Sequence, residues 1–217
     1  MTTNKKKCYL TLIAISCAVT CTYAIDLIAE ADTYVRGGAG GDPSRNYDYG
    51  SGERNPRLLV RSLGDPTRAM YAYIRFDLSA YSSSGRNASF FLTSIDGARW
   101  KLGQLKVYGL PQKAGLTPQD WNESSLSYNT TGSELIKPVT VGRDPFNISE
   151  LVFLGDMPAG APGESVALSS DALDIFLYDH AGRKVTLIVA CEFAANRAMN
   201  FASREAESGV PMLKLND

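Results

Sequence analysis

The chain has 217 residues, and its 22 lysines and arginines against 23 aspartates and glutamates give a formal net charge of −1. Hydrophobic residues make up 44% and charged residues 21%, a mixture typical of a globular protein rather than a disordered one. The balance of charge also argues against a general nucleic-acid binder, which usually carries a clearly basic domain.

Residues 1–24 have the features of a secretory signal. Lys5–Lys7 form a basic start, Leu10–Ala18 is mostly apolar, and Thr22 and Ala24 are small residues where a signal peptidase reads. We therefore predict cleavage after Ala24 and a secreted protein, with one domain over residues 25–217.

Two alternatives remain for this leader. A membrane anchor would need about 20 apolar residues, and Leu10–Ala18 falls short of that length. A lipoprotein signal would use Cys17, but Ala14 stands where a leucine is usual. No later segment is apolar enough to span a membrane.

Removal of the leader leaves 19 basic and 23 acidic residues, a net charge of −4. Of the four cysteines only Cys191 remains, so we expect no internal disulfide. Because Cys191 lies in the apolar run Leu187–Cys191, we predict a buried structural thiol.

Short runs rich in β-branched and aromatic residues recur after the leader, separated by Gly, Pro, Asp, Asn and Ser. This spacing predicts an all-β fold, a jelly-roll β-sandwich of antiparallel strands in a single domain. A short helix is predicted over Ser170–Tyr178, with a serine as its cap. The predicted strands are Leu27–Val35, Leu58–Arg61, Tyr71–Asp77, Ser89–Ser94, Lys106–Leu110, Ser125–Tyr128, Ile148–Leu154, Ser165–Leu168, Val185–Phe193, Met199–Ser203 and Met212–Leu215.

The run from Tyr71 to Leu78 alternates cleanly between two kinds of side chain. Ile74, Phe76 and Leu78 share one face, which suits a core between two sheets. Tyr71, Tyr73, Arg75 and Asp77 share the other face. That second face is polar yet aromatic, so we expect it to be partly exposed.

Catalytic motifs are weak. The single histidine, His180, lies in a turn-like segment, and no Gly-x-Ser-x-Gly elbow supports a serine nucleophile. After the leader only His180 and Cys191 could bind zinc as soft ligands, too few for a catalytic site. Carboxylate pairs are possible in any acidic β protein, but none is marked out. We predict a protein that is not an enzyme.

A structural calcium ion is a plausible cofactor. Glu30 and Asp32 flank Ala31 at the start of the domain, and Asn46 follows in the first loop. Calcium binds six to eight oxygens from carboxylates, amides and carbonyls. These three residues are the predicted ligands, and ordinary surface acids are the alternative.

Four arginines lie within or directly after predicted strands, at positions 36, 61, 75 and 204. A planar guanidinium binds carboxylates and sulfates in a fork, so an arginine-bearing face would suit an anionic polysaccharide. Tyr34, Tyr71 and Tyr73 could stack on its sugar rings. The alternative is internal pairing, of Arg75 with Asp77 of a neighbouring strand or of Arg204 with Glu205 or Glu207.

Several segments match a known pattern in order, and they are Ala31–Arg36, Asn46-Tyr47 with Gly50 nearby, Leu58–Arg61, Tyr73–Ser79, Val107-Tyr108, Asp120–Asn129, Val185–Leu187, Phe201–Glu205 and Pro211-x-Leu213. Together they resemble the DNRLRE-type domains, which include the alginate-binding carbohydrate-binding module family ninety-six. The chain departs from that pattern where Asp48 and Tyr49 interrupt Asn-Tyr-Gly and where Tyr128 replaces a second tryptophan.

The resemblance implies a β-sandwich that binds an anionic polysaccharide such as alginate. It also implies basic residues at Arg36, Arg61, Arg75 and Arg204, where the family often has them. From this we expect a secreted binding module without catalysis. The rival functions are a structural cell-surface or matrix β-sandwich without a sugar ligand, and a jelly-roll polysaccharide lyase that would use tyrosines.

Overall fold

The computed structural model describes residues 24–37, 42–48, 56–61, 69–81, 87–95, 104–136, 146–191 and 198–216. The predicted leader lies outside the described residues, apart from Ala24, which opens the first strand. Within this part of the chain, no helix combines the length and the apolar character that crossing a bilayer takes.

The strands form two main sheets and a two-stranded ribbon, all paired antiparallel. The larger sheet has the order β2 (Ala31–Arg36), β4 (Met70–Asp77), β9 (Lys184–Cys191), β6 (Gln104–Gly109) and β7 (Val152–Pro158). The smaller sheet has the order β1 (Ala24–Ile28), β11 (Met212–Asn216), β5 (Ser89–Thr93) and β8 (Ser165–Leu168). The ribbon pairs β10 (Met199–Ala202) with β3 (Arg57–Val60).

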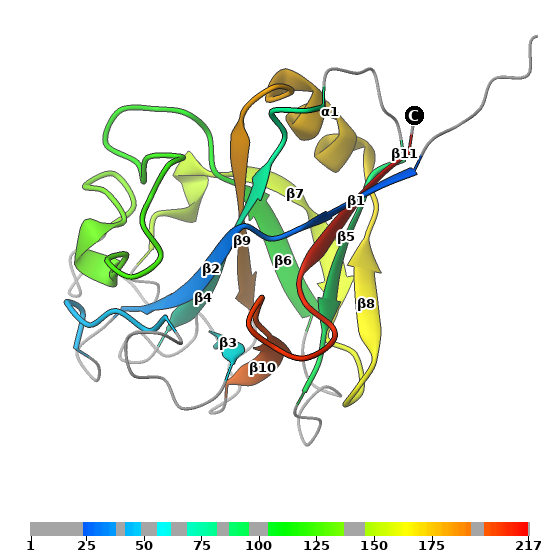
Figure 1. The fold of residues 1–217 in the computed structure, drawn as a ribbon. Coiled ribbons are helices and arrows are strands. Elements are labelled where there is room, and N and C mark those ends of the chain that lie inside the picture. Colours follow the sequence, from blue (N-terminus) through cyan, green and yellow to red (C-terminus); the bar gives the residue numbers. More distant parts are fainter. Residues whose placement is uncertain are drawn as a thin grey trace, which may run out of the picture.

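The predicted all-β sandwich is therefore confirmed. Figure 1 shows the two sheets facing each other, with a single helix at one end and the β3–β10 ribbon at the other. That helix, α1 (Asp171–Asp179), begins after Ser170, whose side chain accepts a hydrogen bond from the Leu173 N–H at 3.0 Å. The predicted serine cap is thus confirmed as well.

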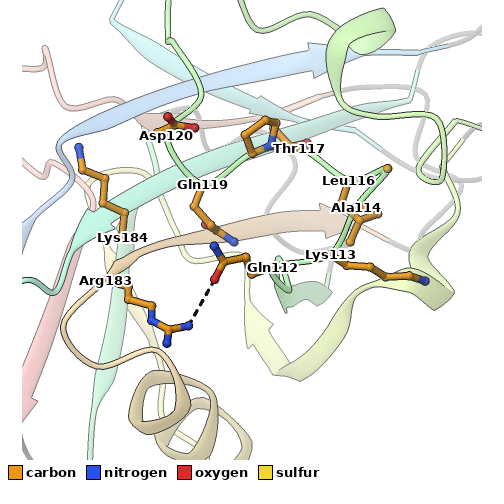
Figure 2. A pocket seen from close by; sticks show the side chains of 11 residues that line it. Gln112, Lys113, Ala114, Leu116, Thr117, Gln119, Asp120, Arg183 and Lys184 are labelled. Atoms are coloured by element: carbon orange, nitrogen blue, oxygen red, sulfur yellow. Dashed lines mark hydrogen bonds between the residues drawn. The ribbon is translucent and has the colours of Figure 1, made fainter.

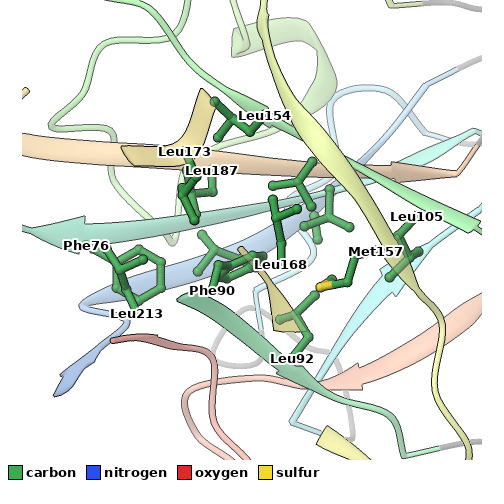
Figure 3. Close-up of a cluster of buried hydrophobic side chains, with 14 of the residues drawn as sticks. Phe76, Phe90, Leu92, Leu105, Leu154, Met157, Leu168, Leu173, Leu187 and Leu213 are labelled. Carbon is green, nitrogen blue, oxygen red and sulfur yellow. The ribbon is translucent and has the colours of Figure 1, made fainter. Parts of the chain in front are cut away.

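The core between the sheets follows from the alternation of side chains along each strand. Ile74 and Phe76 of β4 are fully buried there, and Phe76 meets Phe90 of β5 edge to face at 6.1 Å between ring centroids. Figure 3 shows these rings among leucines from both sheets and from α1. Cys191 is buried and free in the same core, as predicted.

A second core lies on the opposite face of the larger sheet. We call the chain between β6 and β7 that covers this face the overlay, described here over residues 110–136 and 146–151. Its Trp121, Leu126 and Phe146 bury the outward face of the sheet. The larger sheet is therefore packed on both faces, as the green loops beside it in Figure 1 indicate.

Three strand predictions need correction. In the predicted strand Ile148–Leu154, a 3₁₀ helix at Ile148–Glu150 precedes β7. The predicted strand Leu27–Val35 is two strands, because the chain passes from the smaller to the larger sheet at Ala29 and Glu30. The N–H groups of these two residues donate to the carbonyl oxygens of Pro211 and Arg75. Ser125–Tyr128 is a turn followed by a 3₁₀ helix at Tyr128–Thr130.

Candidate functional site

The predicted aromatic sheet face is buried rather than exposed. Tyr71 and Tyr73 are both 0% exposed, because the overlay packs Phe146 and Trp121 against them. Tyr34 is 2% exposed and stacks on Tyr47 with ring centroids 4.8 Å apart. The prediction of a partly exposed aromatic face is wrong, and these rings do not reach solvent to stack on a sugar.

Arg75 lies on this covered face and is held internally. Its guanidinium pairs with Glu30 and donates to the carbonyl oxygen of Trp121, and it lies over the Trp121 ring at 4.9 Å from the centroid. The alternative of internal pairing is confirmed for this residue, with Glu30 as the partner instead of Asp77.

Arg204 is also paired within the protein. Its Nε and Nη2 donate to the two carboxylate oxygens of Glu123 at 2.9 and 2.8 Å, a bidentate contact. Its Nε lies 2.8 Å from Oε1 of Glu205. Internal pairing with a nearby glutamate is confirmed here too.

Arg36 of β2 and Arg61 at the end of β3 lie on either side of the start of β4. Both are bridged to Met70, Arg36 through the β2–β4 ladder and Arg61 through an isolated antiparallel bridge. Arg61 is 8% exposed, and Arg36 is half-buried. Their role toward a ligand stays a prediction.

The predicted calcium ligands are separated. Glu30 lies in the ion pairs with Arg75 and Lys184, and the Asn46 amide donates to the carbonyl oxygens of Glu123 and Leu126 at 2.7 Å. Asp32 instead lies within 4.8 Å of Glu123 and Glu205, measured between one carboxylate oxygen of each. Burial, and then the charge of Glu205, raise the pKa of Asp32 well above its usual range.

His180 does not lie in a catalytic arrangement. It follows α1, and its Nδ1 donates to the carbonyl oxygen of Phe176 at 2.8 Å, which caps the end of the helix. Tyr71 and Tyr73, two of the tyrosines that a lyase could use, are buried.

The structure places a polar groove of about 690 Å³ at the surface between the overlay and the start of β9. Cationic and amide side chains are part of its lining, and Figure 2 shows Arg183 and Gln112 pointing toward each other from the two sides. The lining residues are Gln112, Lys113, Ala114, Gly115, Leu116, Thr117, Pro118, Gln119, Asp120, Arg183 and Lys184.

Packing and hydrogen bonds hold the overlay side of this groove in place. The Leu110 N–H donates to Thr186 of β9 at 3.0 Å, and the Gln119 amide donates to the Leu110 carbonyl oxygen at 2.6 Å. Further along, Trp121 Nε1 donates to the buried Thr186 hydroxyl at 2.9 Å. The groove is therefore anchored to the central strand of the larger sheet.

The opposite side of the groove starts at a tight turn. Gly182 has φ +75°, a conformation that L side chains rarely adopt, and its N–H donates to the carbonyl oxygens of Leu78 and Tyr81. This turn presents Arg183 to solvent before Lys184 enters β9.

The three cations of the groove are held differently. Lys113 pairs with Glu150, and Lys184 pairs with Glu30 at 2.8 Å. Arg183 Nη1 donates to the Gln112 amide oxygen at 3.3 Å, the dashed contact in Figure 2. No ion pair joins Arg183 to a carboxylate among the residues that the structure describes.

This arrangement can bind an acidic, hydroxylated chain. Arg183 offers a fork of N–H donors to a carboxylate or sulfate, and the amides of Gln112 and Gln119 suit hydroxyl groups. None of the lining residues that the structure describes is aromatic.

None of the predicted binding residues lines this groove, because the prediction was based on arginines in and next to strands. The available signal was the pair Arg183-Lys184 directly after the turn glycine Gly182 and before the apolar run of β9.

No family model matches the sequence, and no curated protein matches it either. Among solved structures, the chain is similar to a xylan-binding module, CBM15, with a TM-score of 0.37 and 13% sequence identity. The similarity covers 89% of this chain and 96% of that one. A likeness this distant carries no argument about ligands, and the resemblance to DNRLRE-type domains stays a prediction.

Proposed function

We propose that this protein is a secreted, non-catalytic module that binds an acidic polysaccharide in the groove between the overlay and β9. Alginate-like chains of uronic acids are the proposed ligand class. The proposal moves binding away from the sheet face predicted earlier, because the tyrosines there are buried and Arg75 is paired with Glu30.

The exposed guanidinium of Arg183, which contacts a neutral amide, carries this proposal. An exposed guanidinium whose partner is a neutral amide keeps most of its donors available for an anion. Lys113 and Lys184 add positive potential on either side, even though each also contacts a glutamate. Exposed contacts of this kind are individually weak and screened by salt, so we expect modest affinity.

A second function is favoured by the internal ion pairs of Arg75 and Arg204. Two of the four arginines that suggested an anionic ligand stabilise the fold instead. A structural surface protein without a sugar ligand would use arginines in this way.

Affinity electrophoresis of the full chain separates the two functions. The protein is run in gels containing alginate, pectin, a sulfated galactan or neutral xylan. We expect retardation in the uronic-acid gels that is lost as salt is added. Equal mobility in all four gels would favour the structural protein, and retardation in xylan alone would contradict an acidic ligand.

A further inference from the structure

Three carboxylates from distant segments meet at the edge of β2. We call Asp32, Glu123 and Glu205 the acidic cluster; one oxygen of each lies within 4.8 Å of the other two. Asp32 is 2% exposed, and the two glutamates are half-buried. Like charges this close repel outside bulk water, so a neighbouring cation stabilises the ionised form of the cluster.

The cation that the structure shows on the cluster is Arg204. Its guanidinium contacts both glutamates, and its backbone N–H donates to Oδ2 of Asp32 at 2.7 Å. One guanidinium faces three carboxyl groups, so acidic groups outnumber cations in the cluster among the described residues. A divalent cation would offset this excess when the carboxyl groups are ionised.

A second observation points to the same ligand. Oδ1 of Asp32 has no hydrogen-bond partner in the protein. Because the residue is almost completely removed from solvent, water does not replace that partner. Oε1 of Glu205, by contrast, has Arg204 Nε as an ion-pair partner at 2.8 Å. Buried acceptors without a partner are costly and uncommon, and a metal ion satisfies them.

We propose that the acidic cluster binds a divalent cation, with Ca²⁺ as the preferred ion. The donor set consists of carboxylate oxygens, which hard cations favour, and three carboxylates can supply up to six of the oxygens that calcium takes. Because the Arg204 side chain is 38% exposed, its guanidinium can withdraw from the cluster toward solvent when the ion enters.

The bound ion would join three parts of the fold. Asp32 belongs to β2, Glu123 to the overlay, and Glu205 to the segment after β10. These parts are already linked by the Asp32 N–H, which donates to Glu123 Oε1 at 2.7 Å. Calcium at this point would therefore stabilise the attachment of the overlay to the edge of the sheet.

Calorimetric titration of the EDTA-treated full chain with CaCl₂ tests this site without any sugar. We expect one ion per chain and a Tm raised by about 5 °C or more at saturating Ca²⁺, because the ion binds only the folded state. MgCl₂ should produce a smaller shift, since Mg²⁺ gives up its waters reluctantly.

Matched variants locate the site. Asp32→Asn should abolish the calcium heat, whereas Asp26→Asn, an exposed acid of β1, should leave it unchanged. Glu205→Gln serves as a second test if Asp32→Asn fails to fold. Arg204→Gln should bind Ca²⁺ at least as tightly as the natural chain, since it removes the competing cation.

Two results would overturn the proposal. One is the absence of any calcium heat or Tm shift in the natural chain and in Arg204→Gln. The other is unchanged calcium binding in a folded Asp32→Asn or Glu205→Gln variant. Either result would leave Arg204 as the sole counter-ion of the cluster.

Discussion

Tyr73 illustrates how the overlay changes the chemistry of a strand residue. It lies on β4 beneath Trp121, with ring centroids 6.2 Å apart, and no part of it is exposed. This burial raises the pKa of its hydroxyl well above the ordinary value of tyrosine. The folded protein therefore keeps this proton at alkaline pH, while the unfolded chain loses it.

A pH experiment follows from Tyr73. Since its pKa is raised on folding, its contribution to stability is complete below about pH 10 and is lost as pH rises further. The slope from one such group is about 1.4 kcal/mol per pH unit. Tyr73→Phe should lose stability less steeply above pH 10 in urea denaturation, and Tyr178→Phe, on the surface, should behave like the natural chain. Parallel curves for all three proteins would contradict this account.

Gly109, the last residue of β6, is required by packing. A Cβ added there would lie 2.4 Å from the Phe176 ring of α1, far inside van der Waals contact. Gly109→Ala should therefore lower the free energy of unfolding by about 1–3 kcal/mol in chemical denaturation. With Phe176→Leu added, the double variant should be more stable than the sum of the two single effects predicts. A double variant no more stable than that sum would show that the ring is not the obstacle.

At the level of elements, the strands were largely predictable and the overlay was not. The Tyr71–Leu78 run places Ile74, Phe76 and Leu78 in the core, as its alternation predicted. Its other face could not be assigned from the pattern, because tyrosines suit both a wet surface and a covered one. The overlay, whose sequence has no periodic pattern, covers this face in the folded chain.

Ser125–Tyr128 shows why the overlay lacks such a signal. Ser125 and Leu126 both donate their N–H groups to the Asn122 carbonyl oxygen, and the Ser127 N–H donates to the Thr130 hydroxyl at 2.8 Å. Local hydrogen bonds of this kind satisfy the backbone without a neighbouring strand. The β-like composition was therefore overridden by turn chemistry.

Trp121 is the anchor of the overlay. Trp121→Ala should lower the free energy of unfolding by about 3–5 kcal/mol, because the buried ring is lost from the second core. Trp121→Phe keeps a ring but loses the bond to Thr186, at a cost of about 1–2 kcal/mol. Guanidinium denaturation measures both, with Tyr178→Ala as the exposed control. A loss below 1 kcal/mol for Trp121→Ala would refute the anchoring role.

For the whole molecule, net charge is a poor guide to the ligand. The chain is slightly acidic, and two cations of the groove, Lys113 and Lys184, pair with glutamates, yet Arg183 meets only an amide there. Local potential steers a charged ligand within about a Debye length, near 10 Å at 0.1 M salt. An acidic protein can therefore present a cationic groove.

The candidate site itself depends on contacts between distant segments. Arg183 and Gln112 are 71 positions apart, and neither lies in a motif that spacing reveals. The strand arginines were easier to notice, but the structure places Arg75 against Glu30 and Arg204 against Glu123. Sequence patterns indicated residue types suited to an anion, while the partners that consume their charge appear only in the folded chain.

The most direct test of the proposed function compares two variants that each lose one positive charge. Arg183→Gln and Lys214→Gln each remove one exposed cation, the first from the groove and the second from β11 of the other sheet. Calorimetric binding of a uronic-acid oligosaccharide should weaken about tenfold or more for Arg183→Gln, the loss of one charge-assisted contact, and should not change for Lys214→Gln. Equal affinity of both variants and the natural chain would contradict binding at this groove.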